Sequence, residues 1–315
     1  IISNGGRMLS YLNKKNVTHC TLPVHSKNFL YMPFVAKKIN KIIKEHDIDI
    51  LHIRSRGPAW LLPYIDKKNL KTISTFHNVY GHQNIFKKVY NKALSKTDFI
   101  VAISKYVSDE IIKNYQINPE KVRVINRGVD TNFYNGKVED KKKLMFFLNK
   151  NHISLENKIV LYPGRLTEWK GQIDFLKIIE KLRDQPYVFY FVGDDKNLNY
   201  TNKLITAIKK KNLGSKCKIL GHLNKEDLKM MYYCSNLIVS MPLKPEGFGR
   251  IISESLAMKK MVIAYNIGGV KNQLENLDNI YKVNFNDNSQ VLEKIKLILE
   301  SPSQNFENIN IASRE

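Results

Sequence analysis

The sequence predicts an α/β fold with two doubly wound domains in tandem, on the basis of its length, its apolar fraction and its periodicity. The 315 residues exceed the roughly 100–200 residues of one typical domain, and 43% of them are apolar, as in globular proteins. Short apolar segments alternate with longer amphipathic segments along the whole chain. Several short segments are apolar on both faces, which is typical of parallel strands between two layers of helices.

The expected strands are the short segments rich in β-branched and aromatic residues. In the first domain they are residues 17–22, 48–53, 71–76, 98–103 and 121–125. In the second domain they are residues 158–162, 187–192, 217–220, 236–240, 261–265 and 280–283. Ile1, Ile2 and Ser3 predict the end of another strand, so we expect the chain to lack the beginning of the whole protein.

The segments between the strands carry apolar residues at helical spacing. They predict helices over residues 33–46, 84–96, 104–115, 138–150, 170–184, 199–212, 225–234, 249–259 and 288–300. The periodicity is weakest over residues 126–157, and we therefore predict a domain boundary near residue 135. The two domains would then span residues 1–135 and 136–315.

The chain is strongly basic, with 51 Lys and Arg against 29 Asp and Glu and a net charge of +22. Residues 1–135 hold 22 basic and 9 acidic residues, so the smaller domain carries +13 of this charge. One interpretation is biased codon usage, because 42 of the 51 basic residues are Lys. The other is attraction to an acidic partner, either nucleic acid or an anionic membrane surface.

Simple patterns disfavour a disulfide framework, a zinc site, a membrane-spanning helix and a divalent-metal site. The cysteines Cys20, Cys217 and Cys234 are few and far apart, which argues against a disulfide framework or a zinc site and fits a reducing cytoplasm. No apolar run approaches the ~18 residues of a bilayer-spanning helix. The segment Asp47-Ile48-Asp49 has a spacing that can bind a divalent metal, but it precedes its strand. Ligands of such sheets bind at the carboxyl ends of the strands, so we predict no metal site.

The first segment with candidate functional residues is Tyr162–Gly171 (YPGRLTEWKG), which follows a predicted strand and opens a helix. Free backbone N–H groups and the helix dipole favour an anion there. Arg165 and Lys170 add two positive charges, which suit a diphosphate that must leave with extra negative charge. The segment lacks the P-loop pattern. The alternative is an ordinary polar loop with solvated charges.

The second segment, Glu246–Glu254 (EGFGRIISE), also connects a strand to a helix. Gly247 and Gly249 allow a ligand to approach the backbone closely. The carboxylates of Glu246 and Glu254 can accept hydrogen bonds from sugar or ribose hydroxyls without a metal. The alternative is that one acid complements the helix dipole and the other is exposed.

Together these two segments resemble the family four retaining glycosyltransferases, and the Glu246…Glu254 spacing matches the E-x7-E pattern of that family. This family has the GT-B fold, in which two Rossmann-like domains face each other across a cleft. Further similar segments follow in the family's order over nearly the whole chain: Phe76-His77, Val101–Ser104, Arg127–Asp130, Val192–Asp194, Gly221-His222 and Gly268-Gly269.

The resemblance implies a metal-independent hexosyltransferase that retains the anomeric configuration and uses a UDP-, GDP- or ADP-sugar without any other cofactor. The residues it implies to be catalytic are His77, Arg165, Lys170 and Glu246. Those it implies to bind the donor are Gly164, Gly193, Leu220, Leu223, Gly247, Phe248, Gly249 and Glu254. In this scheme the cations hold the diphosphate, Glu254 the ribose and Glu246 the sugar. The family's first strand and glycine-rich loop would largely precede Ile1, and its C-terminal helix would follow Glu315.

The acceptor side is predicted from Arg54 and Arg56, which follow the strand at 48–53 in the first domain. We hypothesise that they bind an acidic acceptor such as a phosphorylated or carboxylated lipid-linked sugar. The alternative is that one arginine pairs with an acid and the other is solvated. We therefore expect a cytoplasmic enzyme of cell-envelope glycan or lipopolysaccharide synthesis, peripheral on the inner face of the cytoplasmic membrane.

Two other functions stay open. A sugar-nucleotide epimerase can share this fold, although Arg165, Lys170 and the Glu246 segment favour transfer. A basic nucleic-acid-binding protein is the alternative from another class. It predicts a recognisable reading module or basic residues interleaved with exposed aromatic residues, and neither is evident in the sequence.

Overall fold

The computed structural model describes residues 1–6, 9–14, 17–81, 83–278 and 281–301. The chain divides into two compact units, Ile1–Asn126 and Arg127–Glu315, each with a hydrophobic core of its own. The boundary lies earlier in the chain than the position near residue 135 that the periodicity indicates. The reason is that the intervening segment packs on the second unit, where Tyr134 is buried in the core.

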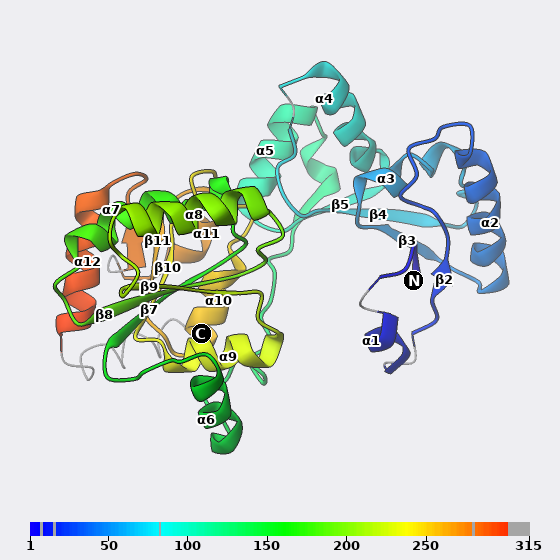
Figure 1. Ribbon diagram of the computed structural model, residues 1–315. Helices are drawn as coiled ribbons and strands as arrows, with labels where there is room; N and C mark the ends of the chain where they lie inside the picture. The colour runs from blue at the N-terminus through cyan, green and yellow to red at the C-terminus, as the bar shows by residue number, and fades with distance from the viewer. Residues whose placement is uncertain (7–8, 15–16, 82, 279–280, 302–315) are drawn as a thin grey trace. The chain divides into compact units, whose positions relative to one another are not determined.

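The first unit contains a four-stranded parallel sheet in the order β3-β4-β5-β6 (Figure 1). These strands are β3 (Ile50–Ile53), β4 (Lys71–Phe76), β5 (Phe99–Ala102) and β6 (Val122–Val124). A separate parallel pair is formed by β1 (Ile2–Ser3) and β2 (Cys20–Thr21). The first-domain strands therefore lie where the sequence predicts them, with shorter bounds for several.

The first unit contains short and medium-length helices, and a side chain caps the start of two of the α-helices. The α-helices are α1 (Leu9–Lys14), α2 (Met32–Glu45), α3 (Arg56–Ala59), α4 (Ile85–Lys92) and α5 (Lys105–Tyr115). Short 3₁₀ helices are η1 (Leu62–Tyr64), η2 (Ala93–Lys96) and η3 (Pro119–Lys121). The Asn84 side chain accepts from two backbone N–H groups at the start of α4, and Ser104 caps α5 in the same way.

The second unit contains a six-stranded parallel sheet in the order β12-β11-β10-β7-β8-β9. The strands are β7 (Lys158–Pro163), β8 (Tyr187–Val192), β9 (Cys217–Gly221), β10 (Leu237–Ser240), β11 (Val262–Tyr265) and β12 (Lys282–Val283). The chain builds β7 to β9 in one direction and then β10 to β12 in the other. The strand order therefore reverses between β7 and β10, which are hydrogen-bonded neighbours.

Helices cover both faces of this sheet, as the doubly wound prediction requires (Figure 1). They are α6 (Lys141–Lys150), η4 (Glu168–Lys170), α7 (Gln172–Lys181), α8 (Leu198–Lys210), α9 (Lys225–Cys234), α10 (Arg250–Ala257), α11 (Gly268–Leu274) and α12 (Asn288–Glu300). Helix α7 packs beside α8 and α12, and α9 and α10 lie on the opposite face (Figure 1). The predicted α/β fold class is thus confirmed. Among the described helices, none combines the length and apolarity needed to cross a bilayer.

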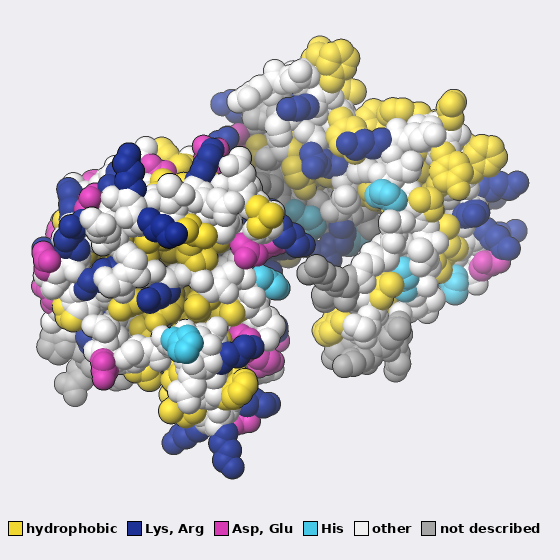
Figure 2. Space-filling model, viewed as in Figure 1, with side chains coloured by type: hydrophobic (Ala, Val, Ile, Leu, Met, Phe, Trp, Pro, Cys, Tyr) yellow, Lys and Arg dark blue, Asp and Glu magenta, His cyan; other side chains and the backbone are white. Residues whose placement is uncertain are grey.

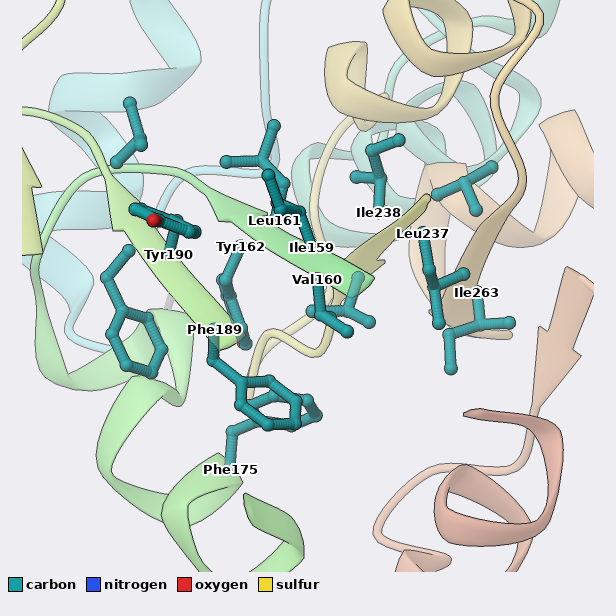
Figure 3. Close-up of a cluster of buried hydrophobic side chains, with 14 of the residues drawn as sticks. Ile159, Val160, Leu161, Tyr162, Phe175, Phe189, Tyr190, Leu237, Ile238 and Ile263 are labelled. Atoms are coloured by element: carbon teal, nitrogen blue, oxygen red, sulfur yellow. The ribbon is translucent and has the colours of Figure 1, made fainter. Parts of the chain in front are cut away.

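The core of the second unit extends to the carboxyl ends of its central strands (Figure 3). The rings of Tyr162 on β7 and Phe175 on α7 make an edge contact with centroids 5.3 Å apart. The Tyr162 hydroxyl donates to the Lys170 carbonyl at 2.5 Å and accepts from the Met241 amide at 3.2 Å. Burial raises the pKa of Tyr162 well above its usual value, so the phenol stays protonated. A core side chain therefore fixes the loops after both β7 and β10.

Candidate active site

The two segments singled out in the sequence meet at the carboxyl ends of β7 and β10. Lys170 lies in the loop after β7 and Glu246 in the loop after β10, 76 residues further along the chain. Lys170 Nζ and Glu246 Oε1 form an ion pair, and each side chain is only 11% exposed. In open α/β sheets ligands bind where the strand order reverses, and this pair lies at that point of the sheet.

Glycines bring the backbone of the first loop close to the neighbouring strand. Gly164 has a φ of +146°, and Lys170 packs on it, with its Nζ 3.7 Å from the position a Cβ would take. A Cβ on Gly193, just after β8, would overlap the Gly164 carbonyl oxygen. The Gly164 amide donates to the Val192 carbonyl at 2.7 Å. Gly164 and Gly193, two of the donor-binding candidates, are therefore adjacent at the ends of β7 and β8.

The two cations of the first loop share an aromatic neighbour. The Arg165 guanidinium carbon lies 5.8 Å, and Lys170 Nζ 4.7 Å, from the centroid of the Trp169 ring. Arg165 is exposed, whereas Lys170 is buried at 9% residue exposure. The Gln172 side chain donates to the Arg165 carbonyl at 3.0 Å and fixes the backbone at that residue. One exposed cation thus lies next to one buried cation.

The loop after β10 is held by the start of α11. Gly249 begins α10 with a φ of +88°, and a Cβ there would lie 2.5 Å from Val270 Cγ2. A Cβ on Gly269 would overlap the Gly247 carbonyl oxygen. The Gly269 amide donates to the Glu246 carbonyl at 2.8 Å. These close contacts position Glu246, whose Oε2 lies 3.7 Å from the Cβ position at Gly249.

Glu254 on α10 is buried at 6% exposure and binds two side chains. Arg250 Nη2 lies 2.7 Å from its Oε1, and the Tyr232 hydroxyl donates to its Oε2 at 3.0 Å. Burial, and then the charge of Glu254, raises the pKa of Tyr232 well above its usual value. Glu254 and Phe248 line a cavity of about 370 Å³ beside Arg250. The predicted ribose-binding acid is therefore held in one orientation next to a cavity.

The donor-binding candidates Leu220 and Leu223 lie one strand further from the reversal point than Gly193 does. Leu220 is in β9 and Leu223 follows it, and both are half-buried against the core. The Gly193 amide donates to the Gly221 carbonyl at 2.8 Å, which joins the ends of β8 and β9. Gly193 thus links these leucines to the loop at Gly164.

The first-unit candidates gather at the carboxyl ends of β3 and β4, which are paired neighbours. His77 directly follows β4 and is half-buried, and Arg54 directly follows β3 and is exposed. Arg56 Nη1 donates to Asn91 Oδ1 at 2.9 Å, and its guanidinium carbon lies 4.3 Å from the centroid of the Tyr80 ring. Neither of these two partners carries a negative charge that would neutralise Arg56.

The segment Asp47-Ile48-Asp49 lies at the opposite, amino end of β3. Within the described ranges, no group of three or more His, Cys, Asp or Glu is placed to hold a metal ion.

Sequence reasoning missed several residues that shape the site. Arg250 could have been found, because it lies four residues before Glu254 on one helix face. Tyr162 and Tyr232 carry no such local signal, since their partners are distant in the sequence. Gln273 donates to the carbonyls of Phe248 and Gly249 and had no signal either.

Comparisons with known proteins agree with this arrangement. The family "Glycosyl transferases group 1" matches residues 146–314, and "Glycosyltransferase Family 4" matches residues 2–133. The crystal structure of a glycosyltransferase from Rickettsia africae ESF-5 is 34% identical, with a TM-score of 0.89. The match covers 100% of this chain and 83% of that one.

Two further proteins extend the comparison. HepE of Anabaena, crystallised with UDP and glucose, shares the fold at 18% identity and a TM-score of 0.82, over 98% of this chain and 83% of its own. A Campylobacter jejuni protein is 27% identical over 75% of this chain and 62% of its own length. Its name is N-acetylgalactosamine-N,N'-diacetylbacillosaminyl-diphospho-undecaprenol 4-alpha-N-acetylgalactosaminyltransferase. With both halves matched and a close structural relative, the chain belongs to the group 1 glycosyltransferases of family four and is a glycosyltransferase with the GT-B fold.

Proposed function

We propose that this glycosyltransferase is a retaining, metal-independent hexosyltransferase whose donor is a UDP-, GDP- or ADP-sugar. The observation that carries the proposal is the Lys170–Glu246 ion pair at the reversal point of the second sheet. An ammonium group has three N–H donors, so Lys170 can bind Glu246 and still donate to a diphosphate. Arg165 adds a planar fork that suits phosphate oxygens.

The remaining residues of the second unit have assignable roles in donor binding. Glu246 Oε2 would accept from a sugar hydroxyl, and Glu254, held by Arg250 and Tyr232, would accept from the ribose. The backbone of Gly247 and Gly249 would line the sugar pocket. Leu220 and Leu223 would provide the apolar wall for the base, because they lie at the strand edge beyond Gly193.

The proposed reaction is a front-face displacement. The bond between the anomeric carbon and the diphosphate oxygen breaks, and the acceptor oxygen bonds to the same face of that carbon. The acceptor proton passes to the leaving phosphate oxygen, so no protein nucleophile is needed. Lys170 and Arg165 would stabilise the negative charge that develops on the diphosphate, and His77 would align the acceptor.

We further propose an acceptor of the cell envelope that carries an acidic or lipid-linked group. The diphospho-undecaprenol in the name of the Campylobacter jejuni relative supports this class. Arg54 and Arg56 at the end of β3 are suitable ligands for its phosphate or carboxylate. The enzyme would then work at the cytoplasmic membrane, on its inner face.

The test combines donor binding with product analysis on the full chain. Thermal unfolding is followed with UDP-glucose, UDP-N-acetylglucosamine, GDP-mannose and ADP-glucose. A true donor at about 100 times its Kd adds ~2.7 kcal/mol of apparent stability. Incubation of that donor with undecaprenyl-diphosphate-linked sugars should release the nucleoside diphosphate, and NMR should show a product with the anomeric configuration of the donor. An epimerised sugar nucleotide without transfer, or an inverted product, would contradict the proposal.

A further inference from the structure

The first unit exposes an unusual set of large apolar side chains on two neighbouring segments. On the segment that leads into α2 and on the first turn of that helix, Phe29 is 55% exposed, Leu30 85% and Phe34 65%. On α4, Ile85 is 70% exposed, Phe86 81% and Val89 55%. We call these six residues the apolar surface. Figure 2 shows hydrophobic side chains gathered over α4 and over the segment leading into α2, with Lys and Arg side chains among them.

The two segments are joined by an aromatic bridge. The Phe29 ring makes an edge contact with Trp60 at 5.3 Å between centroids, and Trp60 stacks on Tyr90 at 5.9 Å. The Trp60 indole N–H donates to the Tyr90 carbonyl at 3.2 Å. Since Tyr90 belongs to α4, this bridge places the segment that carries Phe29 beside that helix.

The apolar surface is fixed by local structure. The Asn84 side chain accepts from the amides of Phe86 and Lys87, which holds the first turn of α4. The Leu30 amide donates to Asn28 Oδ1 at 3.1 Å, which closes the turn before α2. The structure therefore holds these side chains outward on ordered backbone.

The two segments that carry the apolar surface contain basic but no acidic side chains. No acidic residue occurs between residues 22 and 44 or between residues 67 and 97. Lys27 Nζ lies 5.8 Å from the centroid of the Tyr90 ring, and Lys96 Nζ lies 5.8 Å from that of Trp60. Lys87 and Lys92 are also exposed on α4. Exposed apolar anchors ringed by lysines without acids are complementary to an anionic lipid surface.

We propose that this apolar surface inserts into the interface of an anionic bilayer. The aromatic and aliphatic side chains would enter the boundary between headgroups and acyl chains, and the lysines would contact lipid phosphates. A second copy of the chain is disfavoured as the occupant, because two such surfaces would bring their lysines together.

The same surface is connected to the acceptor candidates. Asn91 on α4 is buried, its side chain accepts from Arg56 at 2.9 Å and donates to the Gly81 carbonyl at 2.7 Å. A bilayer bound at α4 would therefore place lipid headgroups near Arg56. This last step rests on the proposed function, whereas membrane binding itself does not.

The experiment measures co-sedimentation of the full chain with vesicles of phosphatidylcholine alone and with roughly one third phosphatidylglycerol. We expect binding to the anionic vesicles that weakens as NaCl rises from about 50 mM to about 500 mM. The variant Leu30→Ser/Phe86→Ser should bind at least about tenfold more weakly. The matched control Phe146→Ser/Leu198→Ser removes side chains that are 70% and 69% exposed in the second unit, and it should bind like wild type.

A second pair of variants separates charge from apolar insertion. Lys87→Glu/Lys96→Glu should lose anionic binding, and Lys142→Glu/Lys209→Glu, also exposed lysines, should lose much less. If the serine variant fails to fold, the comparison of these two lysine variants still tests membrane binding by the first unit. Three outcomes would overturn the proposal. The test and control variants could lose vesicle binding equally, or the wild type could bind neutral and anionic vesicles equally. The third outcome is that the wild type does not bind vesicles and instead forms a dimer that Leu30→Ser/Phe86→Ser breaks. Because no donor or acceptor is used, failure here leaves the transferase assignment intact.

Discussion

The ion pair between Lys170 and Glu246 joins the two loops that flank the reversal point of the second sheet. Both side chains are largely buried, so removal of one charge leaves the other without compensation. We expect Lys170→Met or Glu246→Gln to lower the free energy of unfolding by about 3 kcal/mol each. The double variant should recover most of that loss and remain inactive, because the polar groups of the site are absent.

The control for this cycle is Lys105→Met, since Lys105 and Asp109 form an exposed pair on α5. Its effect on stability should stay below about 1 kcal/mol. Urea unfolding of wild type, the two single variants and the double variant measures the coupling energy between Lys170 and Glu246. Single variants as stable as wild type would show that the Lys170–Glu246 contact is not a buried pair.

Gly193 is required because of its closeness to Gly164. A Cβ at residue 193 would overlap the Gly164 carbonyl oxygen and push the loop that carries Arg165. We expect Gly193→Ala to reduce stability by about 2 kcal/mol and to abolish donor binding. Gly214→Ala is the matched control, because nothing lies within 4 Å of a Cβ at that residue. Equal behaviour of the two alanine variants in calorimetry would refute this role for Gly193.

Tyr232 orients Glu254 through a buried hydrogen bond. Burial raises the pKa of Tyr232, so its hydroxyl donates throughout the neutral range. Tyr232→Phe leaves one oxygen of a buried carboxylate without this donor, and we expect a loss of about 2 kcal/mol in stability. If Glu254 binds the ribose, KM for the donor should rise more than kcat falls. The neighbouring Tyr233→Phe, at an exposed side chain, should change neither parameter.

Asp98 gives the first unit a defined acid dependence. The Thr72 amide and then the Thr72 hydroxyl donate to its carboxylate at 2.8 Å, and both lower the pKa of Asp98. A carboxyl whose folded pKa lies below its unfolded value stabilises the fold above the unfolded pKa, and this contribution is lost as the pH falls through the folded pKa. Thr72→Val should therefore cost about 1 kcal/mol at neutral pH, and less in acid once the Asp98 carboxyl is protonated. Urea unfolding at neutral and at acidic pH measures the free energy of unfolding of wild type and of Thr72→Val. The same difference between the two proteins at both pH values would contradict this role of Asp98.

Much of the strand pattern could be predicted because it depends on local sequence. β4 and β8 have the predicted bounds, since β8 is an apolar run that ends at Gly193 and β4 is a segment rich in β-branched residues that ends before His77. The predicted helix at 170–184 begins only at Gln172, because Gly171 takes a φ of +79° and Lys170 ends a 3₁₀ turn. The short helices α1, α3 and α11 were not predicted, since each has few residues and α3 and α11 contain glycine.

The site was predictable in its motifs but not in its contacts. Strand-to-helix loops with glycines and charges at Arg165 and Glu246 are local signals. The ion pair of Lys170 depends on the strand order, which places residues 76 positions apart side by side. The partners of Glu254 show the same division: Arg250 lies one helical turn away, whereas Tyr232 comes from α9.

The most direct test of the central claim is isothermal titration of the full chain with the sugar nucleotide found by thermal unfolding. We predict that Lys170→Met weakens binding at least about tenfold, because a buried cation at the reversal point is lost. Lys177→Met, at an exposed lysine of α7, should bind the donor like wild type. Equal affinity of wild type and Lys170→Met would contradict a diphosphate site between β7 and β10.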